Sequence, residues 1–149
     1  MTNTAPLRPD TLPPGLLALL TAMPELAVAL SGGLDSRFLT HAALLAGCRV
    51  TALHITGPHM PPRETEEARR WATARGVTFM TVPLNPLSIP AIAAGQRDRC
   101  YHCKHAAFTA LLATAASLPL CDGTNADDLT AYRPGLRALR ELGIHSPLA

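Results

Sequence analysis

Residues 31–36 read Ser-Gly-Gly-Leu-Asp-Ser and combine two hydroxyls, a carboxylate and two glycines. An apolar stretch at 26–30, typical of a buried strand, precedes them, and a helical pattern from about Asp35 to Ala46 follows. A tight turn between a strand and a helix presents backbone N–H groups to an anion, and the helix dipole favours negative charge there. Gly32 and Gly33 are expected to take positive φ and to let the backbone approach a ligand closely. The stretch therefore predicts a phosphate-binding turn.

The same residues have a plainer interpretation, a strand-to-helix turn that only needs glycine. A bare turn does not require serine, aspartate and serine at these spacings, which favours the phosphate-binding interpretation. A Walker A loop is excluded because the pattern GxxxxGK[ST] does not occur in the chain. Arg37, directly after the motif, either adds positive charge near the phosphates or points to solvent.

A second polar stretch, at 121–128, follows an apolar segment and reads Cys-Asp-Gly-Thr-Asn-Ala-Asp-Asp. Three of these residues carry carboxylates, namely Asp122, Asp127 and Asp128. Together they suit a hard cation such as Mg²⁺ held against phosphate oxygens. The alternative is a helix cap, in which Asn125 or Asp127 starts a helix and Asp128 lies in its first turn. The two interpretations are compatible.

Arg133 follows within the run Tyr-Arg-Pro-Gly at 132–135. A guanidinium group can clamp a phosphate or a carboxylate through two parallel hydrogen bonds. An exposed surface arginine is the alternative, and the motif alone does not decide between the two.

Cys100 and Cys103 form a Cys-x-x-C pattern in the run Arg-Cys-Tyr-His-Cys-Lys at 99–104. Such a pair can be redox-active, bind zinc or hold part of an iron–sulfur cluster. One pair cannot complete an all-cysteine zinc site, and the other two cysteines, Cys48 and Cys121, are isolated in the sequence. Ordinary helix-start thiols are the alternative. Because Cys121 ends a predicted strand, we expect it near the phosphate site.

The elements around these motifs alternate between strand and helix. Strands are predicted at 26–30, 49–55, 78–82, 118–121 and 144–146, and helices at 15–23, 35–46, 64–75, 89–94, 102–116 and 135–142. This alternation predicts an α/β fold, a Rossmann-like α/β/α sandwich around a parallel sheet of about five strands. Such sheets bind ligands at the carboxyl ends of their strands, where both polar stretches lie. Residues 1–14, with four prolines, are expected to be a flexible arm before one domain at 15–149.

The composition narrows the class of protein. With 149 residues, 48% of them hydrophobic, the chain can bury the core of one globular domain. An aromatic content of 4% and a net charge of +2 argue against a nucleic-acid partner. The sequence has neither an apolar run of about 18 residues nor a signal-peptide pattern. We therefore expect a cytoplasmic protein with no membrane partner.

Taken together, five motifs resemble those of the ATP-dependent sacrificial sulfur transferases, the LarE family of the ATP pyrophosphatase (PP-loop) superfamily. They are SGGLDS at 31–36, RCYHCK at 99–104, DGTNADD at 122–128, YRPG at 132–135 and ELGIHSPL at 141–148. The resemblance implies a PP-loop ATP-binding domain that adenylates the carboxylate of a pyridinium mononucleotide and releases pyrophosphate. Sulfur is then inserted to give a thiocarboxylate, on the route to a nickel-pincer cofactor.

The resemblance also implies roles for particular residues. The triphosphate is expected on Ser31, Gly32, Gly33, Asp35 and Ser36, and further nucleotide contacts on Gly123, Thr124 and Asn125. Mg²⁺ is expected on Asp127 and Asp128, and a [4Fe–4S] cluster, found in one branch of the family, on Cys100 and Cys103. The residues expected to take part in catalysis are Asp35, Asp128 and Arg133.

Members of this family continue well past the Ser-Pro-Leu segment that ends at Leu148, so the resemblance is to an N-terminal half. The absent C-terminal part carries a sulfur-handling cysteine and substrate-binding residues. A small-molecule carboxylate or nucleotide substrate is therefore expected, together with self-assembly or a separate partner chain. Two other functions stay open: a nucleotide-binding subunit without turnover, and another PP-loop enzyme that amidates or thiolates.

Overall fold

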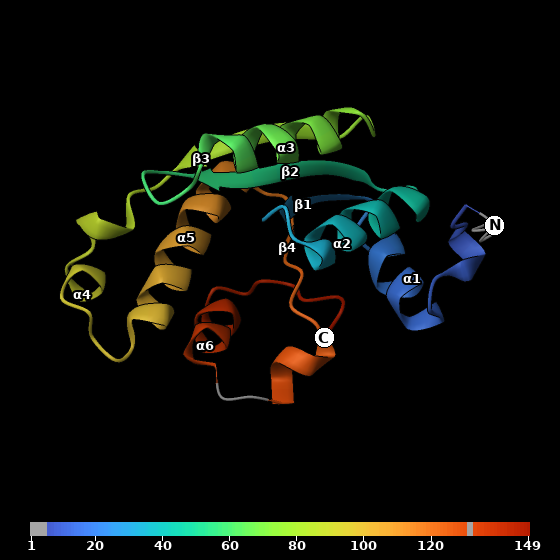
Figure 1. The fold of residues 1–149 in the computed structure, drawn as a ribbon. Coiled ribbons are helices and arrows are strands. Elements are labelled where there is room, and N and C mark those ends of the chain that lie inside the picture. The colour runs from blue at the N-terminus through green and yellow to red at the C-terminus, as the bar shows by residue number, and fades with distance from the viewer. Residues whose placement is uncertain (1–5, 131–132) are drawn as a thin grey trace, which may run out of the picture.

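A computed structural model describes residues 6–130 and 133–149. In these residues four parallel strands form one sheet: β1 (Glu25–Ala29), β2 (Arg49–Thr56), β3 (Thr78–Pro83) and β4 (Leu120–Cys121). Their order across the sheet is β3-β2-β1-β4 (Figure 1). The chain runs from β1 toward one edge and returns to place β4 on the other side of β1. The loops after β1 and β4 therefore lie side by side at the point where the strand order reverses, which is where such sheets bind ligands.

The predicted fifth strand at 144–146 is wrong, because this segment contributes only an isolated parallel bridge between Cys121 and His145 in the described residues. The bridge is closed by two backbone hydrogen bonds, in which His145 N–H donates to Leu120 and Asp122 N–H donates to His145, each at 2.9 Å. Since β4 itself has only two residues, it offers too little edge for a longer partner strand.

Helices cover both faces of the sheet, as the alternating pattern predicts. The helices α1 (Pro14–Thr21), α2 (Leu34–Leu45) and α3 (Pro62–Thr73) share one buried cluster with Leu26 and Val28 of β1. The helices α5 (Arg99–Ala115) and α6 (Pro134–Glu141) share the other cluster with Ala27. Successive residues of β1 thus alternate between two apolar layers. The predicted α/β/α sandwich is confirmed.

Helix α5 begins at Arg99, about three residues before its predicted start. Asp98 takes the N-cap position, and His102 N–H donates to the Asp98 carbonyl at 3.2 Å. The short helix α4 (Pro90–Ala93) comes just before it in the chain. The early start of α5 brings Cys100 and Cys103 into the first turns of a helix.

The arm expected at 1–14 lies partly outside the described residues. In its described part, residues 6–14, a 3-10 turn at Pro9–Thr11 leads to Leu12, which is 5% exposed and packs into the cluster beside α1. Across residues 6–130 and 133–149, no helix combines the length and apolar character that crossing a bilayer would require.

Candidate functional site

The loop between β1 and α2 turns sharply at Gly32, whose φ of 85° lies in the left-handed region that glycine tolerates. Gly33 has φ −74°, so the expectation of positive φ at both glycines is wrong. A Cβ on Gly33 would meet only the Ser31 hydroxyl, at 3.4 Å. Because a helix leaves its first N–H groups without intrahelical acceptors, the start of α2 directs backbone donors at whatever lies beyond the loop.

The two serine hydroxyls of the motif brace this loop from inside. Their oxygens lie 3.0 Å apart, and Ser31 N–H donates to Ser36 Oγ at 3.2 Å. Gly33 N–H donates to Ser31 Oγ at 3.2 Å. Ser36 is buried, whereas Ser31 is exposed. Ser36 therefore fixes the shape of the loop, and Ser31 has a hydroxyl that can also meet a ligand.

The loop after β4 touches the start of α2 at Gly123. A Cβ on Gly123 would lie 2.8 Å from the Ser36 nitrogen and 3.2 Å from the Asp35 Cβ. A side chain does not fit at this distance from rigid backbone, so glycine is what lets the two loops meet. Gly123 is thus a contact between the two predicted motifs.

Asn125 joins the same two loops through its side chain, since its Nδ2 donates to Asp35 Oδ2 at 3.0 Å. It also begins the short 3-10 helix at Ala126–Thr130. Asp128 N–H donates to Asn125 Oδ1 at 3.1 Å, and Asn125 N–H donates to Asp128 Oδ2 at 3.0 Å. The helix-cap alternative is therefore correct for Asn125 and Asp128. The cap and the contact with Asp35 coexist.

The three carboxylates of this stretch have different surroundings. Asp122 is buried and accepts hydrogen bonds from the hydroxyls of Thr124 and Ser146, each at 2.6 Å. It therefore ties the loop to the C-terminal segment, and it also lines the cavity described below. Asp127 is exposed and lies outside the cavity described below, whereas Asp128 lines it.

Arg133 lies beside this group. Its Nη1 is 3.4 Å from Asp128 Oδ1, and both side chains line the cavity. Its side chain is 58% exposed. The arginine is thus held near the carboxylate while its charge stays accessible to an anion in the cavity.

A cavity of about 870 Å³ opens at the carboxyl ends of the strands. Its polar lining includes Ser31, Gly33, Asp35, Ser36, Gly123, Thr124, Asp128 and Arg133. Its apolar lining includes Leu53, Ile55, Leu84, Ala107, Phe108, Leu111, Leu136 and Leu139. Gly32, Asn125 and Asp127, also predicted to bind nucleotide or metal, do not line it. The volume and the mixed lining are typical of a small-molecule site.

His54 is a residue that sequence reasoning missed. It lies on β2, is 1% exposed, and its Nδ1 donates to the carbonyl of Leu30 at 2.7 Å. Its Nε2 forms a 3.2 Å hydrogen bond with the Thr65 hydroxyl of α3. His54 thereby anchors the residue that precedes the phosphate loop. The signal in the sequence was a histidine inside an apolar run that predicts a buried strand, where a polar side chain needs hydrogen-bond partners.

The four cysteines fall into two pairs. Cys100 and Cys103 line the cavity from α5. Cys48 and Cys121 are buried in the opposite apolar layer, where Cys48 Sγ donates to the Leu20 carbonyl at 3.3 Å. Burial, and then the charge of Asp122, raise the pKa of Cys121 to about 12. The expected place of Cys121 near the phosphates is wrong, because strand alternation turns its side chain to the other face.

The donor groups fit the two implied metal centres differently. No group of three or more His, Cys, Asp or Glu side chains is arranged to hold a metal ion in the described ranges. Mg²⁺ usually takes one or two protein carboxylates together with substrate phosphates, so Asp35 and Asp128 fit its needs. A [4Fe–4S] cluster is held by about four thiolates, and the cavity presents only Cys100 and Cys103. Cys100 and Cys103 by themselves do not complete the ligand set of such a cluster.

Arg37 follows neither of its predicted alternatives. Its guanidinium carbon lies 5.6 Å from the ring centroid of Trp71 on α3, and it does not line the cavity. It is half-buried rather than pointing into solvent. The arginine therefore packs α2 against α3 instead of adding charge near the phosphates.

No protein-family model matches the chain. An uncharacterized protein of Synechocystis is 36% identical over 126 residues, which are 82% of this chain and 47% of that protein. The pyridinium-3,5-bisthiocarboxylic acid mononucleotide synthase of Lactiplantibacillus plantarum is 32% identical over 138 residues, 89% of this chain and 50% of that protein. The chain thus spans about half the length of the curated relatives it matches.

Solved structures with the same fold include the NMN synthetase of Francisella tularensis, with a TM-score of 0.58 and 15% identity over 81% of this chain and 56% of that one. Another is the glutamine-dependent NAD⁺ synthetase of Acinetobacter baumannii in complex with ADP, with a TM-score of 0.57 and 18% identity over 87% of this chain and 28% of that one. These likenesses establish the fold of PP-loop synthetases. The match to the synthase confirms, over about half of that protein's length, the predicted resemblance to the LarE-type sulfur transferases.

Proposed function

We propose that this chain binds ATP in the cavity and transfers AMP to the carboxylate of a small acid, with release of pyrophosphate. The observation that carries the proposal is the meeting of the loops after β1 and β4. Gly123 lies against the start of α2, and Asn125 donates to Asp35 at 3.0 Å. The two predicted nucleotide motifs thus border one cavity.

The phosphates belong on the loop at 31–36. Backbone donors at the start of α2 and the Ser31 hydroxyl provide hydrogen bonds to oxygen, and the serine bridge between Ser31 and Ser36 holds these donors in place. Donors fixed before the reaction need not reorganise as negative charge develops on the leaving pyrophosphate.

Asp35 and Asp128 are the residues that would hold Mg²⁺ beside the phosphates. The chemistry that Mg²⁺ would supply there is positive charge, which stabilises the pyrophosphate as it leaves the α phosphorus atom. Asn125 keeps the Asp35 carboxylate oriented, and Arg133 does the same for Asp128 while it adds positive charge to the cavity. Asp35 lies in the first turn of α2, and the other three side chains come from the part of the chain between β4 and α6.

A pyridinium mononucleotide carboxylate is the acid we propose. The relative from L. plantarum is named for a pyridinium bisthiocarboxylic acid mononucleotide, and the F. tularensis structure is an NMN synthetase. The cavity offers an apolar wall for a planar ring and the cation of Lys104, whose Nζ lies 5.4 Å from the Phe108 ring centroid. A ring that carries acid groups suits that combination.

The test is product analysis with the whole chain, ATP, Mg²⁺ and pyridinium-3,5-dicarboxylic acid mononucleotide. We expect AMP transfer and one pyrophosphate per turnover, with no ADP. Nicotinic acid mononucleotide and amino acids serve as comparison acids. Binding of ATP without pyrophosphate release from any acid would contradict adenylation and support a nucleotide-binding subunit.

A further inference from the structure

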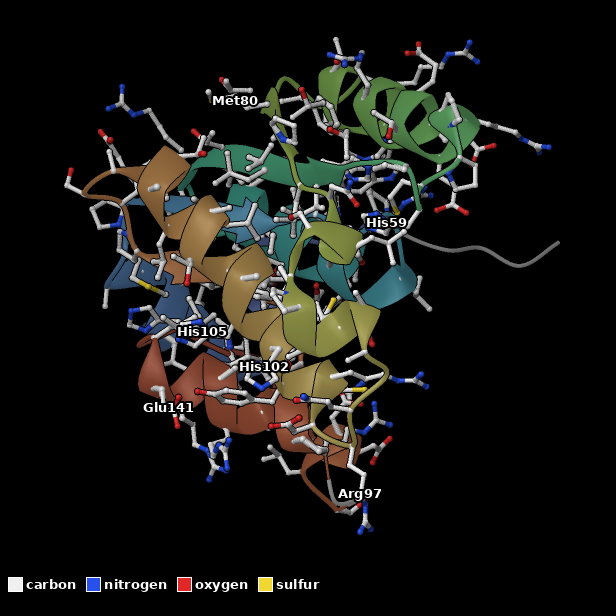
Figure 2. The ribbon with its side chains drawn as sticks, turned by 90° about the vertical axis from the view of Figure 1, so that its left-hand side faces the viewer. His59, Met80, Arg97, His102, His105 and Glu141 are labelled. Carbon is white, nitrogen blue, oxygen red and sulfur yellow. The ribbon has the colours of Figure 1, made fainter. Side chains whose placement is uncertain are left out.

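One face of α5 carries both accessible thiols into the cavity. The residues of α5 that line it are Cys100, Cys103, Lys104, Ala107, Phe108 and Leu111, which follow the spacing of one helix face. His102 and His105 lie outside that lining, together with Glu141 on the outer side of α5 and α6 (Figure 2). The two cysteines are therefore neighbours on the same surface of the same helix.

The other two cysteines cannot take part in chemistry at this surface. Cys48 and Cys121 are 6% and 0% exposed and lie in the cluster on the opposite face of the sheet. Burial raises the pKa of both thiols, so their reactive thiolate forms are scarce. Any exchange with a reagent that enters the cavity falls on Cys100 and Cys103.

The spacing of this pair is close to what a disulfide needs. Residues three apart on a helix have Cβ atoms about 5–6 Å apart, and a disulfide requires about 3.5–4.5 Å. A modest tightening of the first turns of α5 closes the gap. The Asp98 carboxylate makes no side-chain cap hydrogen bond to the backbone and instead contacts His102 Nε2 at 3.0 Å, on the side of α5 that does not line the cavity. A bond formed this way is strained, and strained disulfides are easily reduced.

We propose that Cys100 and Cys103 form a reversible dithiol–disulfide site in the wall of the cavity. Each thiol loses a proton and an electron, one sulfur–sulfur bond forms, and the two electrons reduce a disulfide oxidant such as oxidised glutathione to two thiols. The reduced pair presents two sulfur nucleophiles to the cavity. In the oxidised pair the two sulfurs are bonded to each other, so neither is available as a nucleophile. This site goes beyond adenylation and does not depend on it.

The experiment equilibrates the whole chain anaerobically with reduced and oxidised glutathione at a series of ratios. After an acid quench and alkylation, intact and peptide masses identify the state of each cysteine. We expect one disulfide joining Cys100 and Cys103 and a loss of two hydrogen masses, with Cys48 and Cys121 still reduced. The bond should reopen as the proportion of reduced glutathione rises.

Two variants test whether the disulfide joins Cys100 and Cys103. Cys103→Ser should abolish the internal disulfide and leave a glutathione adduct on Cys100, whereas His105→Ala, on the outer side of the same helix, should leave the exchange unchanged. The proposal is overturned if all four thiols stay reduced at every ratio, or if the disulfide contains Cys48 or Cys121. It is equally overturned if iron or zinc binds stoichiometrically through both cysteines and prevents oxidation.

Discussion

The cavity has two walls whose internal bonding differs. The phosphate wall is made by the residues of segments 31–36 and 122–128 that line the cavity, so it excludes Asp127. Hydroxyl, amide and carboxylate groups bond to one another across these two segments. On the thiol wall, the inward face of α5 with Leu53 and Leu84, the lining is mostly apolar and its reactive groups are Cys100 and Cys103. The phosphate wall is held in one arrangement, and the thiol wall is held mainly by packing.

This difference separates two kinds of recognition. A bonded set of donors suits a ligand that is the same whichever acid reacts, such as the triphosphate of ATP. An apolar surface with a few polar groups accepts a range of ring-shaped molecules and fixes their orientation weakly. We expect substitutions on the phosphate wall to impair every reaction of the protein, and those on the thiol wall to change which acid reacts.

The largest effect is expected from Asp35→Ala on the phosphate wall. Loss of the carboxylate removes a proposed Mg²⁺ contact and the acceptor of the Asn125 amide. Pyrophosphate release should fall by about 100-fold to 1,000-fold, as when a preorganised electrostatic group is removed. Asp127→Ala is the matched control, because Asp127 is exposed and outside the cavity. Equal losses in both variants would contradict the assignment of roles.

Gly123→Val is expected to disrupt the phosphate wall by a steric clash. The added Cβ would start 2.8 Å from the Ser36 nitrogen and must push the two loops apart. ATP affinity measured by calorimetry should drop by about 100-fold, equivalent to about 3 kcal/mol. Gly15→Ala on α1 is the control, because nothing lies within 4 Å of a Cβ there. Unchanged affinity in Gly123→Val would show that contact between the loops is not needed.

A smaller effect is expected where the two walls meet. Arg133→Ala removes the cation beside Asp128, and ATP affinity should weaken by about 10-fold. Arg137→Ala is the control, because Arg137 pairs with Glu141 at 3.5 Å and does not line the cavity. If calorimetry gives the same affinity for both variants, Arg133 is an ordinary surface arginine.

The smallest effect is expected from Cys121, which is buried on the face of the sheet opposite the cavity. The pKa of Cys121 is raised from 9.0 to about 12, so above pH 9 the unfolded chain loses this proton while the folded chain keeps it. The free energy of unfolding should therefore fall between pH 9 and 12, with about 1 kcal/mol lost near pH 10 through this thiol. Urea denaturation at pH 7 and pH 10 should show a smaller drop for Cys121→Ala. An equal drop would contradict the buried environment.

The two walls also differ in how far the sequence predicts them. The phosphate wall is built from short stretches of sequence. A strand, a glycine turn, two serines and a helix start follow one another in order, and the loop at 122–125 follows another strand. The alternation of strands and helices is therefore enough to place both loops at one edge of the sheet. The contact of Gly123 with Ser36 and the amide bond from Asn125 to Asp35 were not predictable, because they join residues about ninety positions apart.

The thiol wall depends on where a helix begins and on which face of the sheet a side chain lies, and the order of residue types in the sequence does not determine either. Where α5 begins decides that Cys100 and Cys103 face the cavity, and the predicted start fell about three residues late. Cys121 ends a strand beside the site, yet the alternation of β4 sends its thiol to the other layer. The predicted fifth strand failed because β4 is only two residues long, which the apolar run at 118–121 does not reveal.

The central claim is that the backbone amides at residues 31–36 hold the phosphates of ATP, and amide chemical shifts test it most directly. In a nitrogen–proton correlation spectrum of the labelled chain, titration with ATP and Mg²⁺ should shift the signals of Gly32 to Ser36 most strongly, with smaller shifts at Gly123 and Thr124. Adenosine without phosphates should leave the amides at 31–36 unmoved. If saturating ATP shifts none of these amides, or shifts only residues remote from this loop, the account is contradicted.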